Sequence, residues 1–341
     1  MRLGIQLIKE NQFIRDGMLR ARPHLLLRLG VALLLVVIGL AGCGGGGSTQ
    51  PKLTPTPTPN PSPSPSPTPA ITADHVFLVV LENHSFSSVI GSPLMPYLNA
   101  LAAAHSLAAN YFANAHQSIA DYFMLTTGQM ESGDNNFTGT VADDNVARAI
   151  SGAGKSWKAY MESLPAAGYT GNDVYPYVKH HNPFSYITDV LDTSAQAANI
   201  VPLTELSLDL SSGSAPAFAF IVPNIENDAH DCPQGGLNCA DSAKLAAADN
   251  WLKTNIDPLI KSPAFANSVL IITWDEGDIS DVANGGGQVA TVLVGVRVKT
   301  AFQSQTFYQH QSTLRLILDL LQVSDHPGAS AGAPAMQDFF Q

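Results

Sequence analysis

The sequence has few basic side chains, and this shortage excludes one large class of function. Its 341 residues include 17 Lys and Arg against 28 Asp and Glu, so the formal net charge is −11. Proteins that bind nucleic acids need a basic face that neutralises phosphates. The charge balance therefore argues against a nucleic-acid partner and fits a mildly acidic globular domain.

The apolar run near the amino terminus is too short to cross a bilayer comfortably. It covers residues 31–40, follows two arginines, and ends in Leu-Ala-Gly-Cys at 40–43; a spanning helix needs about 20 apolar residues. A basic flank, a short apolar core and small residues before a cleavage point are typical of a secretory signal. The ending resembles a bacterial lipobox, so residues 1–43 are predicted to be a lipoprotein signal with a lipidated Cys43. A single transmembrane anchor is the alternative.

Residues 44–72 contain almost nothing apolar that a core would bury. Glycine gives this segment flexibility, and its alternating prolines favour extended polyproline II. We predict a disordered tether that places the protein at a membrane, either outside the cytoplasmic membrane or in the periplasm. The remaining residues, 73–341, are numerous enough for one large folded domain.

Cysteine is also scarce, with three in the whole chain. Apart from Cys43 these are Cys232 and Cys239, in the loop-like stretch HDCPQGGLNCAD. A pair of cysteines in an exported domain predicts a disulfide that closes a small loop. Two free thiols, or half of a metal site, are the alternatives, and the second would need two further cysteines.

Strand-like and helix-like segments alternate along the folded part, and no internal repeat is present. This alternation predicts a parallel or mixed sheet with helices on both faces. The expected strands cover residues 75–81, 217–222, 268–274 and 290–296. The expected helices cover residues 95–104, 119–127, 156–162, 242–254 and 311–322.

Three polar stretches follow expected strands. They contain, in chain order, Glu82-Asn83, Asp228 with His230, and Asp275-Glu276. Parallel strands bring their carboxyl ends to one edge of a sheet, where these side chains would converge. Oxygen-rich ligands with one or two imidazoles suit Ca²⁺, Mg²⁺, Mn²⁺ or Zn²⁺. A single stretch of this kind is better explained as a solvated loop or helix cap, but three at matching positions favour a divalent metal site.

Two further residues begin helix-like segments. Ser118 stands just before residues 119–127, where a serine is most often a helix cap. A helix amino terminus also binds anions, and a serine there can attack phosphorus if a metal lowers its pKa. His310 precedes an amphipathic segment, where a capping or packing role competes with a role as a ligand.

Five motifs, in this order, resemble the bacterial phosphoesterase family that contains acid phosphatases and phospholipases C. That family belongs to the alkaline-phosphatase-like superfamily, so the resemblance implies a three-layer α/β/α sandwich with a mostly parallel central sheet. It also implies metal-assisted phosphoryl transfer through a serine or threonine nucleophile. It covers nearly the whole folded part of the chain. The motifs are LENHSF (81–86), HQSIADY (116–122), PNIENDAHDC (223–232), ITWDEGD (272–278) and QHQSTLRLILDLL (309–321).

The resemblance implies a role for each matching residue. Ser118 is expected to be the nucleophile and, as its alkoxide, a metal ligand. His230 and His310 are expected near the phosphate as proton donor, electrostatic clamp or ligands of a second metal. The other expected metal ligands are Glu82, Asn83, Asp275 and Glu276, and the other residues expected to bind the substrate are His116, Asp121 and Asp228.

Asp121 is a departure from the family pattern, in which Pro-Asn replaces Ala120-Asp121. One helical turn from Ser118, a charged carboxylate is expected to lie near the phosphoryl group and to repel a dianionic monoester. The substitution predicts a changed substrate, an acidic optimum or lost activity.

The predicted function is therefore an exported, membrane-tethered phosphoesterase acting on small phosphate esters. A phosphomonoesterase of the acid-phosphatase type is favoured. A phospholipase C-like phosphodiesterase, or a non-catalytic metal-binding lipoprotein of the same fold, is the alternative. A sulfatase-like or phosphonate hydrolase ranks last, because no Cys/Ser-x-Pro-x-Arg signature is present.

Overall fold

The computed structural model of the protein describes residues 71–341. The predicted signal at 1–43, including Cys43, and the tether as far as residue 70 lie outside the described residues. Within the described range, no helix is both long enough and apolar enough to cross a membrane.

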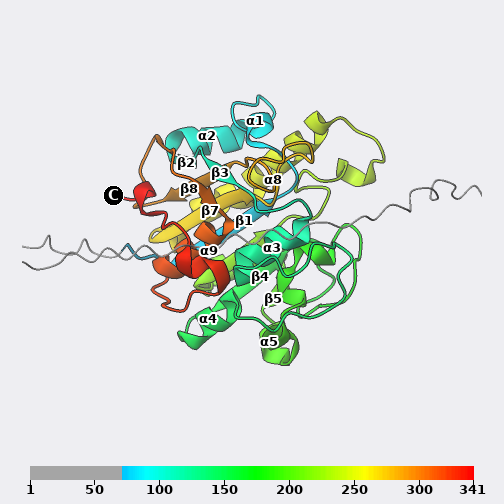
Figure 1. Cartoon of the computed structure of the whole chain (residues 1–341), viewed down its shortest axis with the longest axis vertical. Coiled ribbons are helices and arrows are strands. Elements are labelled where there is room, and N and C mark those ends of the chain that lie inside the picture. Colours follow the sequence, from blue (N-terminus) through cyan, green and yellow to red (C-terminus); the bar gives the residue numbers. More distant parts are fainter. Residues whose placement is uncertain (1–70) are drawn as a thin grey trace, which may run out of the picture. The chain divides into compact units, whose positions relative to one another are not determined.

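A mixed sheet of eight strands forms the centre of the fold (Figure 1). The strand order is β5-β4-β6-β1-β7-β8-β2-β9, and the five strands from β5 to β7 run parallel to their neighbours. β8 is antiparallel to both β7 and β2. The strands are β1 (His75–Leu81), β2 (Ser106–Ala108), β4 (Trp157–Met161), β5 (Ile200–Pro202), β6 (Phe218–Val222), β7 (Ser268–Trp274), β8 (Thr291–Gly295) and β9 (Phe302–Ser304); β3 (Tyr111–Phe112) and β10 (Tyr308–Gln309) pair separately.

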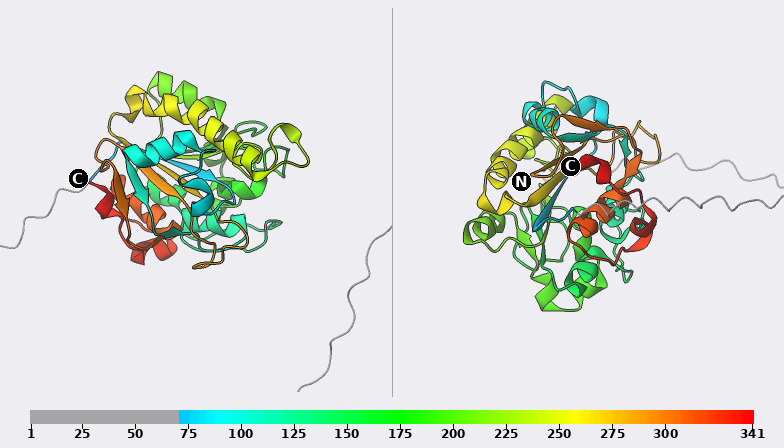
Figure 2. Two further views of the ribbon diagram at one scale, coloured as in Figure 1. Left: turned by 90° about the horizontal axis from the view of Figure 1, so that it is seen from above. Right: turned by 90° about the vertical axis from the view of Figure 1, so that its left-hand side faces the viewer.

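Helices cover both faces of this sheet (Figure 2). On one face α3 packs against α9 and α4, and on the other face α2 packs against α8. The predicted three-layer α/β/α architecture is confirmed. The helices are α1 (Phe86–Val89), α2 (Pro96–Ala104), α3 (Ser118–Thr127), α4 (Val146–Gly152), α5 (Thr188–Leu191), α6 (Ser194–Ala197), α7 (Thr204–Ser212), α8 (Asp241–Ile260) and α9 (His310–Leu320).

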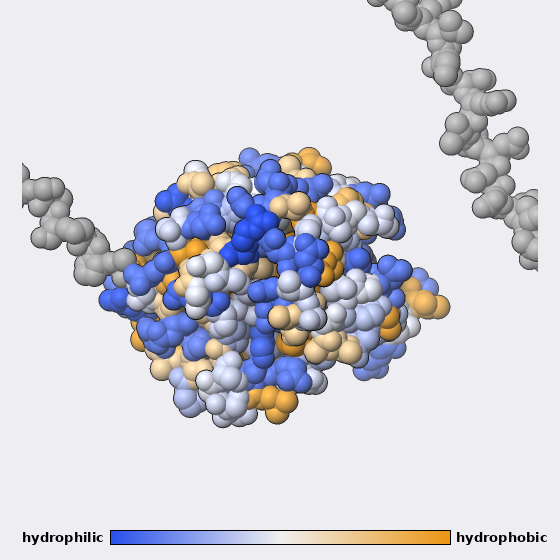
Figure 3. Space-filling model, turned by 90° about the horizontal axis from the view of Figure 1, so that it is seen from below, coloured by the Kyte–Doolittle hydropathy of each residue, from blue (hydrophilic) through white to orange (hydrophobic). Residues whose placement is uncertain are grey.

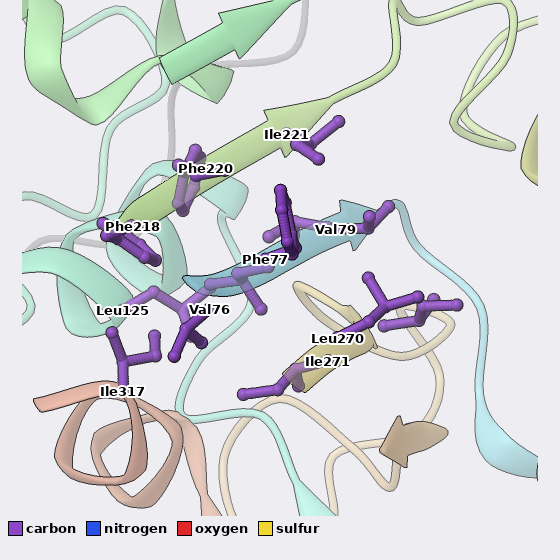
Figure 4. Close-up of a cluster of buried hydrophobic side chains, with 14 of the residues drawn as sticks. Val76, Phe77, Val79, Leu125, Phe218, Phe220, Ile221, Leu270, Ile271 and Ile317 are labelled. Carbon is purple, nitrogen blue, oxygen red and sulfur yellow. The ribbon is translucent and has the colours of Figure 1, made fainter. Parts of the chain in front are cut away.

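The core lies around the central strand β1, whose residues from Val76 to Leu81 are fully buried. Figure 4 shows side chains of β6 and β7 on either side of β1, with Val76 directed toward Leu125 of α3 and Ile317 of α9. A strand buried on both faces reads as a continuous apolar run, which is why this segment is recognisable in the sequence. Each fully buried Val, Leu or Ile contributes about 1.5–3 kcal/mol.

One expected helix is wrong: the segment 156–162 contains strand β4 (Trp157–Met161) instead. The segment contains Trp157 and Tyr160, which favour strands. Only Lys158 keeps partial exposure, because β4 lies between two neighbouring strands. A short, mostly apolar run has too little periodicity to distinguish a helix from a strand, which is why the sequence pattern alone gives the wrong structure here.

Hydrophilic residues cover most of the face shown in Figure 3, and hydrophobic residues appear there as small separate groups. Scattered apolar groups of this kind are normal on a protein surface.

Candidate active site

Strand register brings the first and third polar stretches together. Leu81 of β1 pairs with Trp274 of β7, so the next residue on each strand, Glu82 and Asp275, leaves the sheet at the same level. The Asp275 amide donates to the Leu81 carbonyl at 2.9 Å, which extends the pairing by one step. On the other side of β1, the Glu82 amide donates to the Asp228 carbonyl at 2.9 Å. The predicted convergence of the three acids therefore follows from the parallel order β6-β1-β7.

These acids form a buried cluster that fits a cation. Glu82, Asp228 and Asp275 are all 0% exposed. Burial raises the pKa of each, and the charge of Asp275 raises that of Glu82 further. The Oδ2 atoms of Asp228 and Asp275 have no hydrogen-bond partner. Since unpaired buried carboxylate oxygens are costly, the donor set suits a divalent ion.

Ser118 lies against this cluster. Its Oγ is 3.2 Å from Glu82 Oε2 and 3.1 Å from Glu276 Oε1, so the single hydroxyl proton is offered to one carboxylate or the other. Ser118 is the first residue of α3, and the preceding Gln117 supplies no side-chain cap. The expected cap role is therefore not what this serine does: its side chain points to the acids.

His181 and Tyr122 complete the cluster, and neither is among the site residues predicted from the sequence. The His181 ring lies between Glu82 and Asp228, with its nitrogens 3.3 and 3.4 Å from their oxygens. It stacks on the Tyr122 ring at 5.2 Å, and Tyr122 donates to Glu82 Oε1 at 2.5 Å. Burial, followed by the charge of His230, lowers the pKa of His181, which keeps the ring neutral and able to bind a metal.

Three residues beside the cluster adopt positive φ without being glycine. They are Asn83 at 51°, Gln117 at 110° and Ala229 at 85°. Each stands next to a residue of the cluster, and such conformations concentrate at functional sites. At Asn83 the bend directs the backbone amide to Asp275 Oδ1, 3.1 Å away. At Ala229 it lets the His230 amide donate to Asp228 Oδ1 at 2.8 Å.

One of the predicted histidines, His310, supports the cluster from the protein interior. His310 is fully buried; its Nε2 donates to the Asp275 carbonyl at 2.5 Å, and its Nδ1 accepts from the Tyr111 hydroxyl at 3.0 Å. Burial lowers the pKa of His310 to about 4, so the ring is neutral. The expectation that His310 contacts phosphate is therefore corrected, because Nε2 holds the backbone carbonyl of Asp275 and Nδ1 is occupied by the Tyr111 hydroxyl.

His116 is likewise engaged on both ring nitrogens. Nδ1 lies 2.5 Å from Glu276 Oε2, and Nε2 donates to the Asp281 carbonyl at 2.8 Å. Burial lowers the pKa of His116, but these two hydrogen bonds outweigh it and raise the pKa above its ordinary value. The structure therefore corrects the expected substrate contact, because His116 orients Glu276 instead.

Asp121 does not reach the substrate cavity. It is fully buried, and its Oδ1 accepts from the backbone amides of Asn114 at 2.8 Å and Ala115 at 3.3 Å. The expected helical turn from Ser118 is present, but the carboxylate fixes the loop that leads into α3. The predicted repulsion of a phosphate dianion by direct contact is thus corrected.

A cavity of about 400 Å³ opens in front of Ser118. Several predicted residues line it, namely Asn83, Ser118, His230 and Glu276, together with His84, Gln117, Asn135, Ala229, Asp241, Lys244, Asp278 and Ile279. The His230 side chain is 42% exposed, and its Nδ1 pairs with Asp231 at 2.8 Å, which leaves Nε2 available. The second polar stretch therefore supplies one residue to the cavity, His230, and one to the buried cluster, Asp228.

Cys232 and Cys239 form a disulfide with their Cα atoms 5.7 Å apart. It closes the loop that follows His230 and Asp231 and precedes α8.

Comparison with known proteins gives consistent matches. The sequence profile of the Phosphoesterase family matches residues 92–324. Phosphatidylinositol-3-phosphatase of Mycobacterium tuberculosis is 30% identical over 276 residues, covering 79% of this chain and 83% of that protein. Phosphate-repressible acid phosphatase of Penicillium chrysogenum is 31% identical over 256 residues, covering 70% of this chain but 57% of that longer protein.

Solved structures show the same fold. A protein in the alkaline phosphatase superfamily from Vibrio parahaemolyticus has a TM-score of 0.56 at 13% identity, covering 79% of this chain and 72% of that one. The lipoteichoic acid synthase LtaP of Listeria monocytogenes has a TM-score of 0.54 at 12% identity, covering 76% and 74%.

Proposed function

This chain belongs to the Phosphoesterase family, whose members hydrolyse phosphoester bonds, and from that premise we propose that it is a metal-dependent phosphomonoesterase with Ser118 as nucleophile. One observation carries the proposal: the Ser118 hydroxyl is held between Glu82 and Glu276 at the floor of an open, polar cavity. A serine beside a base or a metal site is the arrangement that nucleophilic catalysis requires.

Acids of the buried cluster, together with residues beside it, would hold the metal. We assign Glu82, Asn83, Ser118, Asp275 and Glu276 to it, and the Glu82, His181 and Asp228 group has donor atoms within 4.8 Å of one another, which suits a further ion. A divalent ion supplies positive charge that neutralises the phosphoryl oxygens and lowers the pKa of the serine hydroxyl.

The remaining steps are carried out by the protein. Ser118 Oγ attacks phosphorus and gives its proton to the carboxylate of Glu82 or Glu276. The bond from phosphorus to the leaving oxygen breaks, and His230 donates a proton to that oxygen. Water then attacks the phosphoserine, and His230 takes a proton from this water. The bond from phosphorus to Ser118 Oγ breaks, the same carboxylate returns its proton to Oγ, and phosphate departs.

A monoester preference is supported by the relatives, which are named phosphatases. The phospholipase C-like alternative has no separate structural support. The non-catalytic alternative depended on Asp121, which is buried away from the cavity.

Metal removal tests the proposed function. The wild type should hydrolyse p-nitrophenyl phosphate faster than bis-p-nitrophenyl phosphate, lose this activity after chelation, and regain it with a divalent ion. Asp275→Asn should lose bound metal and activity together, whereas the exposed Asp74→Asn serves as the control and should retain both. Full activity after confirmed metal removal would contradict a metal-dependent mechanism.

We also propose that the protein is exported and anchored through lipidated Cys43, because residues 1–43 have the anatomy of a lipoprotein signal. Cys43→Ser should release the protein from membranes. If that variant stays in the membrane fraction after a salt wash, the lipid anchor is wrong.

A further inference from the structure

A second cavity adjoins the one that contains Ser118. It has a volume of about 430 Å³ and shares His230 and Lys244 with the first cavity. Its other walls are Tyr175, Asp231, Cys232, Gly235, Gly236 and Leu237. Since His230 is the proposed proton donor to the leaving oxygen, the second cavity is placed on the side where the leaving group emerges.

One wall of this second cavity is held in place by hydrogen bonds. The carboxylate oxygen Glu226 Oε1 accepts from the Tyr175 hydroxyl at 2.7 Å and from the Gly235 amide at 2.7 Å. It thereby connects the segment that carries Tyr175 to the loop closed by the Cys232–Cys239 disulfide. Because both segments are fixed to one side chain, the cavity has a defined shape before any substrate binds.

Lys244 is the single Lys or Arg among the described residues that line either cavity. It lies in the first turn of α8, and its Nζ is 3.5 Å from the Asp241 carboxylate, whose side chain is 74% exposed. That separation is too long for a strong hydrogen bond, so the ammonium retains donors for another partner.

The other charged side chains around the opening are acidic. Asp241, Asp278 and Glu276 line the first cavity, and Asp231 lines the second. An anionic group on a substrate is repelled at these positions and is attracted at Lys244. If the leaving group carries an anionic group of its own, the protein therefore favours its placement next to Lys244.

We propose that Lys244 binds a second anionic group on the leaving group, so that the preferred substrates are phosphomonoesters whose alcohol carries a carboxylate or another phosphate. This inference rests on the proposed function. The reacting phosphoryl group lies at Ser118, the leaving group passes His230 into the second cavity, and its anionic group pairs with Lys244.

Matched substrate pairs test the inference. We compare 3-phosphoglycerate with glycerol 3-phosphate, and 4-carboxyphenyl phosphate with phenyl phosphate, measuring kcat/KM for the full chain. The readout is the ratio of kcat/KM for the carboxylated member to that for its neutral partner. A charge-assisted hydrogen bond predicts that Lys244→Ala lowers this ratio about tenfold in at least one pair.

Two further variants, a control variant and a change of salt concentration distinguish the effect of the Lys244 charge from that of its size. Lys244→Arg should retain the ratio, and Lys244→Glu should lower it below the value for Lys244→Ala. Lys253→Ala is the control, because Lys253 is an exposed lysine on the same helix outside both cavities. High salt should shrink the wild-type ratio, since the Debye length falls to about 3 Å at 1 M.

The outcomes are distinct. Equal losses on both members of each pair would assign Lys244 to the reacting phosphoryl group and overturn the inference, as would ratios that no Lys244 variant changes. If the wild type hydrolyses none of the four monoesters, the proposed function fails and this inference fails with it.

Discussion

At the scale of single residues, the site depends on side chains that hold the acids as much as on the acids themselves. Tyr122 donates to Glu82, His116 contacts Glu276, and His310 holds the carbonyl of Asp275. Partners of this kind fix the orientation of metal ligands and are nearly as important for metal affinity as the ligands. Each can therefore be tested without removing a ligand.

Tyr122→Phe removes one hydroxyl and keeps the buried ring. Because Glu82 loses its 2.5 Å hydrogen bond, the metal concentration for half-maximal activity should rise about 10–100-fold. Metal titration of activity, with Tyr169→Phe as a control outside the cluster, measures this. An unchanged titration midpoint would show that Tyr122 serves packing alone.

Asp121 should act on folding instead of on substrate binding. Asp121→Asn keeps an oxygen that accepts from the amides of Asn114 and Ala115, whereas Asp121→Ala leaves both unsatisfied. We expect Asp121→Ala to lower the free energy of unfolding by about 1–3 kcal/mol and Asp121→Asn to cost less. Urea unfolding measures both. If Asp121→Asn instead changes KM for monoesters and leaves stability unaffected, the carboxylate acts on the substrate.

The sequence indicates the acids at the strand ends but not the residues that arrive from elsewhere. Glu82 and Asp275 directly follow apolar runs, so their convergence can be predicted from topology. His181 follows no strand and belongs to a short 3₁₀ turn at Lys179–His181. Its position between Glu82 and Asp228 depends on the path of a long connection, which local sequence patterns do not specify.

At the scale of elements, long buried strands and the longer helices are predictable, and several short elements are not. β1 and β7 have the expected bounds because each is a run of seven residues that are apolar or buried. β4 and β5 have five and three residues, which is too short for a clear period. Their place in the sheet is set by pairing between distant parts of the chain, because β4 pairs with β6 and β5 pairs with β4.

One link between elements gives a testable pH dependence. Asp209 of α7 accepts from Lys158 and Tyr160 of β4 at 2.6 Å each. Burial raises the pKa of Asp209, but these hydrogen bonds outweigh it and hold the pKa below its ordinary value. The link therefore stabilises the fold above the unfolded-state pKa near 3.9, and the stabilisation is lost as pH falls through the lower folded-state pKa.

The comparison of wild type with Asp209→Asn isolates this contribution. The wild type should be more stable at pH 6, and the difference in Tm should shrink as pH falls below about 4. Thermal unfolding from pH 3 to 7 measures it. A difference in Tm that grows with acidification would have the wrong sign and would contradict the assignment.

At the scale of the whole molecule, the parallel strands at the centre of the sheet bring the residues of the candidate site to one edge of the sheet. β6, β1 and β7 each end beside the same cluster, α3 presents Ser118 to it, and α8 presents Lys244 to the cavity in front. The family fold explains the shared chemistry, while the loops before α8 shape the second cavity. Function on such a fold is decided by the site and not by the architecture.

The central claim is that Ser118 carries the phosphoryl group, and trapping the phosphoenzyme tests it most directly. The protein is mixed with p-nitrophenyl phosphate, quenched rapidly in acid, digested and mapped by mass spectrometry. We expect one phosphorylated peptide, with the phosphate on Ser118, and its absence in Ser118→Ala along with a loss of turnover of about a thousandfold or more. Phosphate on another residue, such as Ser85 or Thr126, or undiminished turnover by Ser118→Ala, would contradict the mechanism.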